Sequence, residues 1–335
     1  GPLGCLLGSS DRLLPLVIEY MIWYLPFLVF YEILNIGMFY IRLDGSPNYA
    51  MMCNATAAIL NILLDYIFIF EFGWGMMGAA FATSLGTVVG GLMTLVYLMH
   101  YSHDLRLYRI KLSRKSLRMT FRNIGYMVKL GNSAFVSEAS IACMMFLGNY
   151  VFIRNLGEDG VAAFSIVCYF FPIIFMVYNA IAQSAQPIIS YNFGAGQPER
   201  VRKALRLSLR TALICGICFF ILTTLCCRNI VALFIDRSYS AFDIAVNGIP
   251  YFGIGFIFFA INMIGIGYYQ SIERGQRATI ITLLRGVVFM LIGFFVLPPI
   301  LGVPGIWLAV PSAELLTTLY IIGIYFKDRF IVRRR

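Results

Sequence analysis

The stretch QSAQPIISYNFGAGQPERVRKALR, residues 183–206, interrupts an otherwise apolar sequence with amides, a proline and glycines and then becomes basic. Pro187 lacks a backbone donor, and Gly194 and Gly196 tolerate positive φ. We therefore predict that a membrane-spanning helix ends here in an irregular turn. The basic residues between Arg200 and Arg206 recur at helical spacing, which suits the anionic headgroups of a membrane surface.

The composition of the whole chain is that of an integral membrane protein. Of its 335 residues, 60% are hydrophobic and only 13% are charged, far from the balance of a soluble domain. A spanning helix needs about 20 apolar residues. The sequence predicts nine such segments, at residues 17–40, 50–70, 78–98, 125–152, 161–189, 207–227, 246–270, 277–297 and 304–326. We therefore expect an all-α integral membrane fold with almost nothing left over for a soluble domain.

Basic residues lie mostly on one side of the predicted nine-helix path. When the loops are assigned to alternating sides, 22 of the 26 Lys and Arg residues fall on one side, against only Arg12, Arg154, Arg228 and Arg237 on the other. Because positive residues stay in the cytoplasm, this asymmetry predicts a cytoplasmic C-terminus and an N-terminus outside. The net charge of +10 is then a topology signal, so we do not expect nucleic-acid binding.

The polar run from His100 to Arg122 is the longest break between predicted spans and separates three helices from six. GMMGAAFA at residues 75–82 and GVPGIWLA at residues 302–309 share the spacing of Gly, Gly and Ala, which indicates an internal repeat. By this alignment the first part lacks three helices of a twelve-helix chain. We expect a partial N-terminal lobe with helices 4–6 at residues 1–99, a basic cytoplasmic linker at 100–124, and a complete C-terminal lobe with helices 7–12 at 125–335.

The opening stretch resembles the signature that follows the eighth helix of the multidrug and toxic compound extrusion (MATE) family. There, Gln-x-x-Gln-Pro precedes Tyr-Asn-Phe/Tyr-Gly-Ala and a basic amphipathic helix, the order found in residues 183–206. Further family-like pieces are NILLDYIFIF at residues 61–70, GAAFAT at 78–83 and LLRGVV at 283–288. The resemblance implies a helical bundle of the MOP superfamily, with nine of twelve transmembrane helices in two lobes. It also implies a transporter and not an enzyme, and the metalloprotease, Walker and serine-hydrolase motifs are missing.

Acidic residues inside predicted spans require a reason, because a charge at the bilayer centre costs about 2.5–3.5 kcal/mol. Asp65 has the best one, since Asn61 lies one helical turn before it and Thr83 falls at a similar depth on the next helix. Three oxygen-bearing side chains suit a hard cation such as Na⁺, and a buried acid can instead carry a proton. The resemblance implies the same role, because the matching Asn, Asp and Thr belong to the cation site of DinF-like relatives. A structural polar cluster between two helices is the alternative.

Other polar side chains in the predicted spans are candidates for the second lobe and for a substrate cavity. Glu138 resembles the membrane acid that several MATE transporters keep on their seventh helix, with a hydrogen-bonded structural role as the alternative. The residues that we assign to the substrate cavity are acids and amides, namely Glu32, Glu314, Gln183, Gln186 and Asn179. Arg285 could extend to the inner membrane face or pair with an acid, and of the two we expect extension to the membrane face.

The resemblance implies a secondary antiporter that lets Na⁺ or H⁺ run inward and exports lipophilic or cationic drugs or metabolites by alternating access. We expect no cofactor and no metal other than the coupling ion. The expected partners are small molecules and the lipid bilayer, and the protein is expected to be a monomer in a bacterial plasma membrane. Two alternatives stay open. One is a lipid-linked oligosaccharide flippase of the same superfamily, and the other is a non-transporting membrane fragment or interaction module.

Overall fold

The computed structural model describes residues 14–103 and 113–333, and all regular elements in these ranges are helices. Contacts divide the chain into two units, here named unit 1 (residues 1–112) and unit 2 (residues 113–335). Within the described ranges, seven helices are long and apolar enough to cross a membrane, or eight when one bent pair counts as a single span. The expected all-helical membrane fold class is therefore confirmed.

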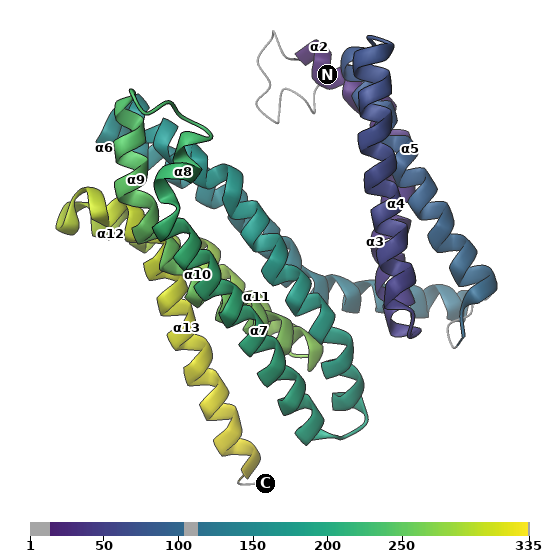
Figure 1. Ribbon diagram of the computed structural model, residues 1–335. Coiled ribbons are helices and arrows are strands. Elements are labelled where there is room, and N and C mark those ends of the chain that lie inside the picture. The colour runs from purple at the N-terminus through teal and green to yellow at the C-terminus, as the bar shows by residue number, and fades with distance from the viewer. Residues whose placement is uncertain (1–13, 104–112, 334–335) are drawn as a thin grey trace. The chain divides into compact units, whose positions relative to one another are not determined.

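Unit 1 contains three long helical segments that pack against one another (Figure 1). Its elements are α2 (Leu14–Tyr24), η1 (Leu25–Phe27), α3 (Leu28–Leu43), α4 (Pro47–Asp65), η2 (Tyr66–Glu71), α5 (Gly75–Val96) and η3 (Tyr97–Tyr101). They form three candidate spans, at Pro15–Leu43, Pro47–Glu71 and Gly75–Tyr101. These spans cover the first three segments that the apolar pattern predicts.

The turns of unit 1 follow from its glycines and one buried acid. Gly45 and Gly73 have φ values of 86° and 66°, a conformation that glycine adopts without steric cost. Asp44, beside the first of these turns, is buried and accepts a hydrogen bond of 2.9 Å from the Tyr97 hydroxyl. The backbone N–H of His103 donates to the same carboxylate oxygen at 2.8 Å. The end of η3 is thereby held to the turn between α3 and α4.

Unit 2 contains α6 (Arg114–Gly194), α7 (Pro198–Leu225), α8 (Cys227–Ala232), α9 (Ser240–Gly253), α10 (Gly255–Ser271), α11 (Gly275–Leu283), η4 (Leu284–Val288), α12 (Phe289–Leu301) and α13 (Val303–Arg333). α6 consists of two helices on either side of Gly157, where φ is 67° and the backbone is not helical, and its two halves cover the predicted spans 125–152 and 161–189. The bent pair α9 and α10, with an angle of 42° between its halves, covers the predicted span 246–270.

The basic linker expected at residues 100–124 is helical at its C-terminal end. α6 already begins at Arg114, and the Ser113 hydroxyl caps this helix by accepting a hydrogen bond of 3.2 Å from the backbone N–H of Ser116. Residues 104–112 of the linker lie outside the described residues. The division into two units falls at residues 112 and 113, and the assignment of the units to lobes stays a prediction.

The helix end expected in residues 183–206 lies at its glycines. α6 continues through Pro187 to Gly194, and the turn to α7 uses Gly196 with a φ of 66°. Pro198 then stands at the start of α7, where its missing N–H has no intrahelical partner to lose. Pro187 alone does not end the helix, because a proline removes only one donor from the helical ladder.

The core of unit 2 is built from aromatic rings. Phe171 and Phe259 stack with ring centroids 5.2 Å apart, and Phe152 meets Trp307 edge to face at 4.8 Å. A Cβ atom at Gly248 would lie 1.9 Å from the Trp307 ring, so this position accepts no side chain without repacking. Such tight contacts fix the relative rotation of α6, α9, α10 and α13.

Candidate cation site

The helices α4 and α5 of unit 1 approach each other closely because glycines on α5 face α4. A Cβ atom at Gly86 would lie 2.6 Å from the backbone oxygen of Ala57 and 3.2 Å from the Cβ of Asn61. At Gly90 a Cβ atom would lie 3.0 Å from the Ala57 side chain. Small residues let membrane helices pack backbone to backbone. The polar side chains of α4 and α5 are thereby brought within reach of each other.

The three side chains expected at one depth of unit 1 lie together in the structure. Asn61 Nδ2 donates a hydrogen bond of 3.3 Å to Thr83 Oγ1, which itself donates to the backbone oxygen of Ala79 at 2.9 Å. The Asn61 side chain also interacts with the Asp65 carboxyl group. The Oδ1 atom of Asp65 is buried and accepts no hydrogen bond from any described residue.

The backbone changes its helical form directly after Asp65. The α-helical hydrogen bonding of α4 ends at this residue, and η2 (Tyr66–Glu71) continues as a π-helix. Single π-helical turns inside α-helices are rare and are found frequently at functional sites. The acid therefore stands at an irregular point of the span rather than within a uniform helix.

The chemistry of this cluster favours a small monovalent cation or a proton. Within the described part of the chain, Asp65 has no Lys or Arg partner, and no group of three or more His, Cys, Asp or Glu side chains gathers as a metal site. One carboxylate with a neutral amide and a hydroxyl carries a single negative charge. One bound proton or one monovalent cation neutralises that charge, whereas a divalent ion would leave an excess of positive charge in an apolar surrounding.

Glu138 lies in unit 2, and the structure gives it no partner among the described residues. Its side chain is exposed on the surface of α6, whereas the neighbouring Ser137 and Ser140 are buried. Ser140 packs directly on Gly286, where a Cβ atom would lie 2.2 Å from the serine Cβ. The buried face of this helix therefore carries serines, and the role of Glu138 stays a prediction.

Glu314 has a fixed cationic partner. Its side chain is 3% exposed, and its Oε1 accepts a hydrogen bond of 2.7 Å from the Nε of Arg285, which is equally buried. Asn262 Nδ2 donates to Glu314 Oε2 at 2.7 Å, and the Thr318 hydroxyl donates to Asn262 Oδ1 at 2.9 Å. The guanidinium carbon of Arg285 also lies 4.4 Å from the centroid of the Phe259 ring. Our expectation that Arg285 extends to the membrane face is wrong, because an internal acid and an aromatic ring satisfy its charge.

Two members of this network, Asn262 and Thr318, are missing from the sequence-based candidates. Asn262 is an isolated amide in the apolar segment GFIFFAINMIGIG, residues 255–267. A single polar residue in such a segment is the sequence signal that could have identified Asn262. Thr318 lies one helical turn after Glu314, on the same face of the helix. Sequence spacing alone does not show that α10 and α13 bring these residues together.

The amides that we assigned to the substrate cavity differ in their surroundings. Gln186 Nε2 donates to Gln270 Oε1 at 2.6 Å, and Gln270 Nε2 donates to Ser133 Oγ at 2.8 Å. This chain links the two halves of α6 through α10. Gln183 and Asn179 are half-buried, and neither side chain forms a hydrogen bond with the described residues. Their assignment to a cavity stays a prediction.

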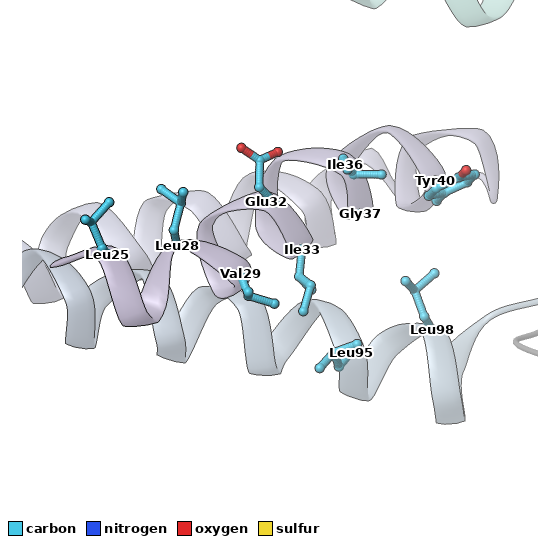
Figure 2. Close-up of a pocket in the computed structure, with 10 residues that line it drawn as sticks. All are labelled: Leu25, Leu28, Val29, Glu32, Ile33, Ile36, Gly37, Tyr40, Leu95 and Leu98. Carbon is cyan, nitrogen blue, oxygen red and sulfur yellow. The ribbon is translucent and has the colours of Figure 1, made fainter. Parts of the chain in front are cut away.

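Glu32 lines an apolar groove on unit 1, which Figure 2 shows in close-up. The groove has a volume of about 650 Å³ and lies along α3 and the end of α5. Apart from Glu32 and the hydroxyl of Tyr40, its lining consists of aliphatic residues and one glycine. The carboxylate of Glu32 points away from Leu95 and Leu98 (Figure 2). This acid is therefore exposed and not part of the Asp65 cluster.

The sequence was compared with models of known protein families. The sequence model of the MatE family matches residues 133–302, just over half of the 335 residues. The chain belongs to the MatE family. The matched range begins at Ser133 of α6 and ends at Gly302, so it includes Glu138 and Arg285. The membership confirms the resemblance that residues 183–206 indicate.

Relatives of this MatE chain include export proteins. The multidrug export protein MepA of Staphylococcus aureus is 26% identical over 344 residues, which cover 98% of this chain and 72% of MepA. A solved multidrug resistance MATE family transporter of the MOP superfamily, in an outward-facing conformation, superposes with a TM-score of 0.87 at 22% identity, covering 98% of this chain and 73% of that one. The relatives are transporters and not enzymes.

A further solved structure of the same fold comes from Pyrococcus furiosus. It is a MOP superfamily transporter whose binding pocket of reverse polarity suggests a different function, and it superposes with a TM-score of 0.87 at 22% identity. The superposition covers all of this chain and 74% of the other. At this level of identity the likeness establishes the MATE fold, in agreement with the all-helical architecture described above.

Proposed function

We propose that this MatE protein is a secondary antiporter that exports lipophilic or cationic molecules in exchange for Na⁺ or H⁺ by alternating access. One observation carries the proposal, the buried Oδ1 of Asp65 without a hydrogen-bond donor at the point where Asn61 meets Thr83. An acid in an apolar helix pair is costly when it is charged and has no counter-ion. A visiting ion removes that cost, and the export function of MepA supports the same reading.

The coupling would arise from the packing of α4 against α5. A proton or Na⁺ on Asp65 neutralises the acid, and Asn61 and Thr83 supply the neighbouring polar atoms. The neutral cluster then allows these helices to repack and lowers the affinity for cargo. Because binding coupling is reciprocal, cargo lowers the affinity for the ion by the same factor. Mutual exclusion of ion and cargo is the thermodynamic basis of antiport.

The remaining assignments follow from the same proposal. Glu138 would act as the second ion-responsive acid, in unit 2. In unit 2, Gln183 and Asn179 would contact the cargo, and in unit 1 the exposed Glu32 would do so. Glu314 and Gln186, which we expected in the cavity, are held by Arg285 and Gln270 and are not proposed for it. We propose that unit 1 belongs to the N-terminal lobe, at residues 1–99, and unit 2 to the C-terminal lobe, at residues 125–335. The protein would work as a monomer in a bacterial plasma membrane, with its C-terminus in the cytoplasm and with cationic small molecules as cargo.

The substitution Asp65→Asn tests the proposal. The complete protein is reconstituted in proteoliposomes, and export of a fluorescent lipophilic cation is followed under an imposed Na⁺ gradient and, separately, under a proton gradient. We expect the gradient that drives the wild-type protein to drive no export in Asp65→Asn, because an amide neither binds a proton nor attracts Na⁺. The wild-type response also identifies the coupling ion.

The matched control is Glu71→Gln, which makes the same change from acid to amide six residues further along, at the exposed end of η2. This variant should retain gradient-driven export. Binding of the cation without a gradient should persist in both variants, which separates lost coupling from a misfolded protein. Ion-driven export by Asp65→Asn at the wild-type rate would refute the assignment.

A further inference from the structure

A second groove lies in unit 2, between helices that the ion cluster does not use. It has a volume of about 610 Å³ and is lined by residues of α7, α10 and α13. α10 packs against both other helices, and the start of α7 and the end of α13 lie at the same end of the unit (Figure 1). Most of its wall is aliphatic or aromatic, as in Leu213, Ile261, Ile322 and Phe326.

One wall of this groove is strongly basic. Arg202, Arg206 and Arg210 of α7 all line it and are spaced four residues apart, so they form one stripe along the helix. The stripe runs for about 12 Å from the start of the helix toward its middle. Glu199 lies 3.5 Å from Arg202, in an exposed pair. For Arg206 and Arg210, no acid among the described residues lies within ion-pair distance.

The groove therefore combines a basic wall, which suits an anionic group, with an apolar floor, which suits a hydrocarbon chain. Exposed arginines beside an apolar surface attract anions, and guanidinium groups bind phosphate oxygens with two parallel hydrogen bonds. The apolar floor beside them, with Ile322 42% and Phe326 51% exposed, needs a hydrocarbon cover. The end of the unit that holds the stripe is the one that the Lys and Arg distribution assigns to the cytoplasmic face.

We propose that this groove is a binding site for an anionic phospholipid. Its phosphate contacts Arg206 and Arg210, and one acyl chain lies along Leu213 and Ile261 toward the membrane interior. A free phosphate would leave the apolar floor uncovered. The cationic cargo proposed above is repelled by three arginines. The inference is independent of the ion cluster, because none of the lining residues belongs to it.

Lipid binding by the complete protein tests this site. The purified protein in detergent is titrated with phosphatidylglycerol and with phosphatidylcholine of the same acyl chains, and bound lipid is counted by native mass spectrometry. We expect the wild-type protein to bind phosphatidylglycerol more tightly. In the double variant Arg206→Gln/Arg210→Gln, the dissociation constant for phosphatidylglycerol should rise about 25-fold, the product of about fivefold for each arginine near an anionic headgroup.

The control is the double variant Arg200→Gln/Lys203→Gln, which removes the same charge from the same helix outside the groove. Its affinity for phosphatidylglycerol should change less than about threefold, since it loses only long-range attraction. Equal losses in the two double variants would show general attraction to a basic helix and would overturn the site. Thermal unfolding of both variants confirms that each is folded.

Two further measurements address the apolar half of the groove. Leu213→Trp fills the groove next to the proposed acyl chain and should weaken binding of phosphatidylglycerol while leaving all the arginines in place. Inorganic phosphate at millimolar concentration should not displace the lipid. Displacement by phosphate, or unchanged lipid binding in Leu213→Trp, would show a simple anion site and would overturn the lipid assignment.

Discussion

Unit 1 and unit 2 each place an acid beside an asparagine and a threonine, half-buried in unit 1 and fully buried in unit 2, and only the acid of unit 2 has its own cation among the described residues. In unit 1 Asp65 is accompanied by Asn61 and Thr83, and one of its oxygens accepts no hydrogen bond within the described residues. In unit 2 Glu314 is accompanied by Asn262 and Thr318, and Arg285 lies 2.7 Å away. A permanent positive charge satisfies the second acid, whereas no Lys or Arg among the described residues pairs with the first, and the proposed ion coupling rests on this difference.

Both clusters also lie next to π-helical backbone. η2 begins directly after Asp65, and η4 contains Arg285 itself. The backbone irregularity is therefore shared by the two units and does not by itself distinguish an ion site from a structural pair. The distinguishing feature is the charge balance. A cluster with a net negative charge attracts a cation, and a neutral pair holds helices together.

The largest effect is expected when the internal cation of unit 2 is removed. Arg285→Met leaves Glu314 buried without a counter-charge, and loss of one partner of a buried pair costs about 3–5 kcal/mol. The double variant Arg285→Met/Glu314→Gln should recover most of this loss, because the amide needs no counter-ion. The measurement is thermal unfolding of the complete protein in detergent, read from intrinsic fluorescence.

An exposed ion pair provides the control for the variants of Arg285 and Glu314. Glu199 and Arg202 lie 3.5 Å apart with side chains 89% and 57% exposed, so Glu199→Gln should change the free energy of unfolding by less than about 1 kcal/mol. If Arg285→Met were as stable as Glu199→Gln, the pair in unit 2 would not be a fixed structural element. The contrast between the two acids would then disappear.

The fold and one of the two acid clusters could be predicted from the sequence. Apolar length alone places the spans, and Asn61 and Asp65 share a helix, so their spacing shows that they face the same side. The short hairpin between α4 and α5 places Thr83 at a similar depth, and the close contact at Gly86 brings it to Asn61. These inferences are local, and local geometry is what a helical period encodes.

The network of Glu314 could not be predicted in the same way. Arg285 is 29 residues away from Glu314, and Asn262 is 52 residues away, each on a different helix. Which faces of these helices meet depends on tight contacts, such as Gly255 against Pro311, where a Cβ atom would lie 3.2 Å from the proline backbone. Such rotations come from packing of the whole unit and leave no periodic signal in the sequence.

A smaller effect is expected when the helix contact that builds the cluster of unit 1 is loosened. Gly86→Ala puts a methyl group 2.6 Å from the Ala57 oxygen and 3.2 Å from the Asn61 Cβ, so α5 must move away from α4. Overpacking of this kind costs about 1–3 kcal/mol. The Asn61–Thr83 hydrogen bond should break as well, so ion-driven export in proteoliposomes should fall together with the unfolding temperature.

The control for the glycine is Gly131→Ala in α6, where no atom lies within 4 Å of the added Cβ. This variant should be neutral or stabilised by up to about 1 kcal/mol, because alanine favours a helix more than glycine does. Normal export by Gly86→Ala would show that the close approach of α4 and α5 is not needed for coupling. The proposal for Asp65 would then lose its geometric basis.

The smallest effect is expected for the hydrogen-bonded side chains of Gln186, Gln270 and Ser133, none of which is charged. Gln186→Ala leaves the Gln270 oxygen without its 2.6 Å donor, which should lower the free energy of unfolding by about 1 kcal/mol. Gln183→Ala removes no hydrogen bond to the described residues and should change stability by less than about 0.5 kcal/mol. If Gln183 lines the cargo cavity, its substitution instead raises the KM for export at unchanged stability. Thermal unfolding and export kinetics of the two variants therefore separate a structural amide from a cargo-binding one, and equal behaviour in both assays would remove that distinction.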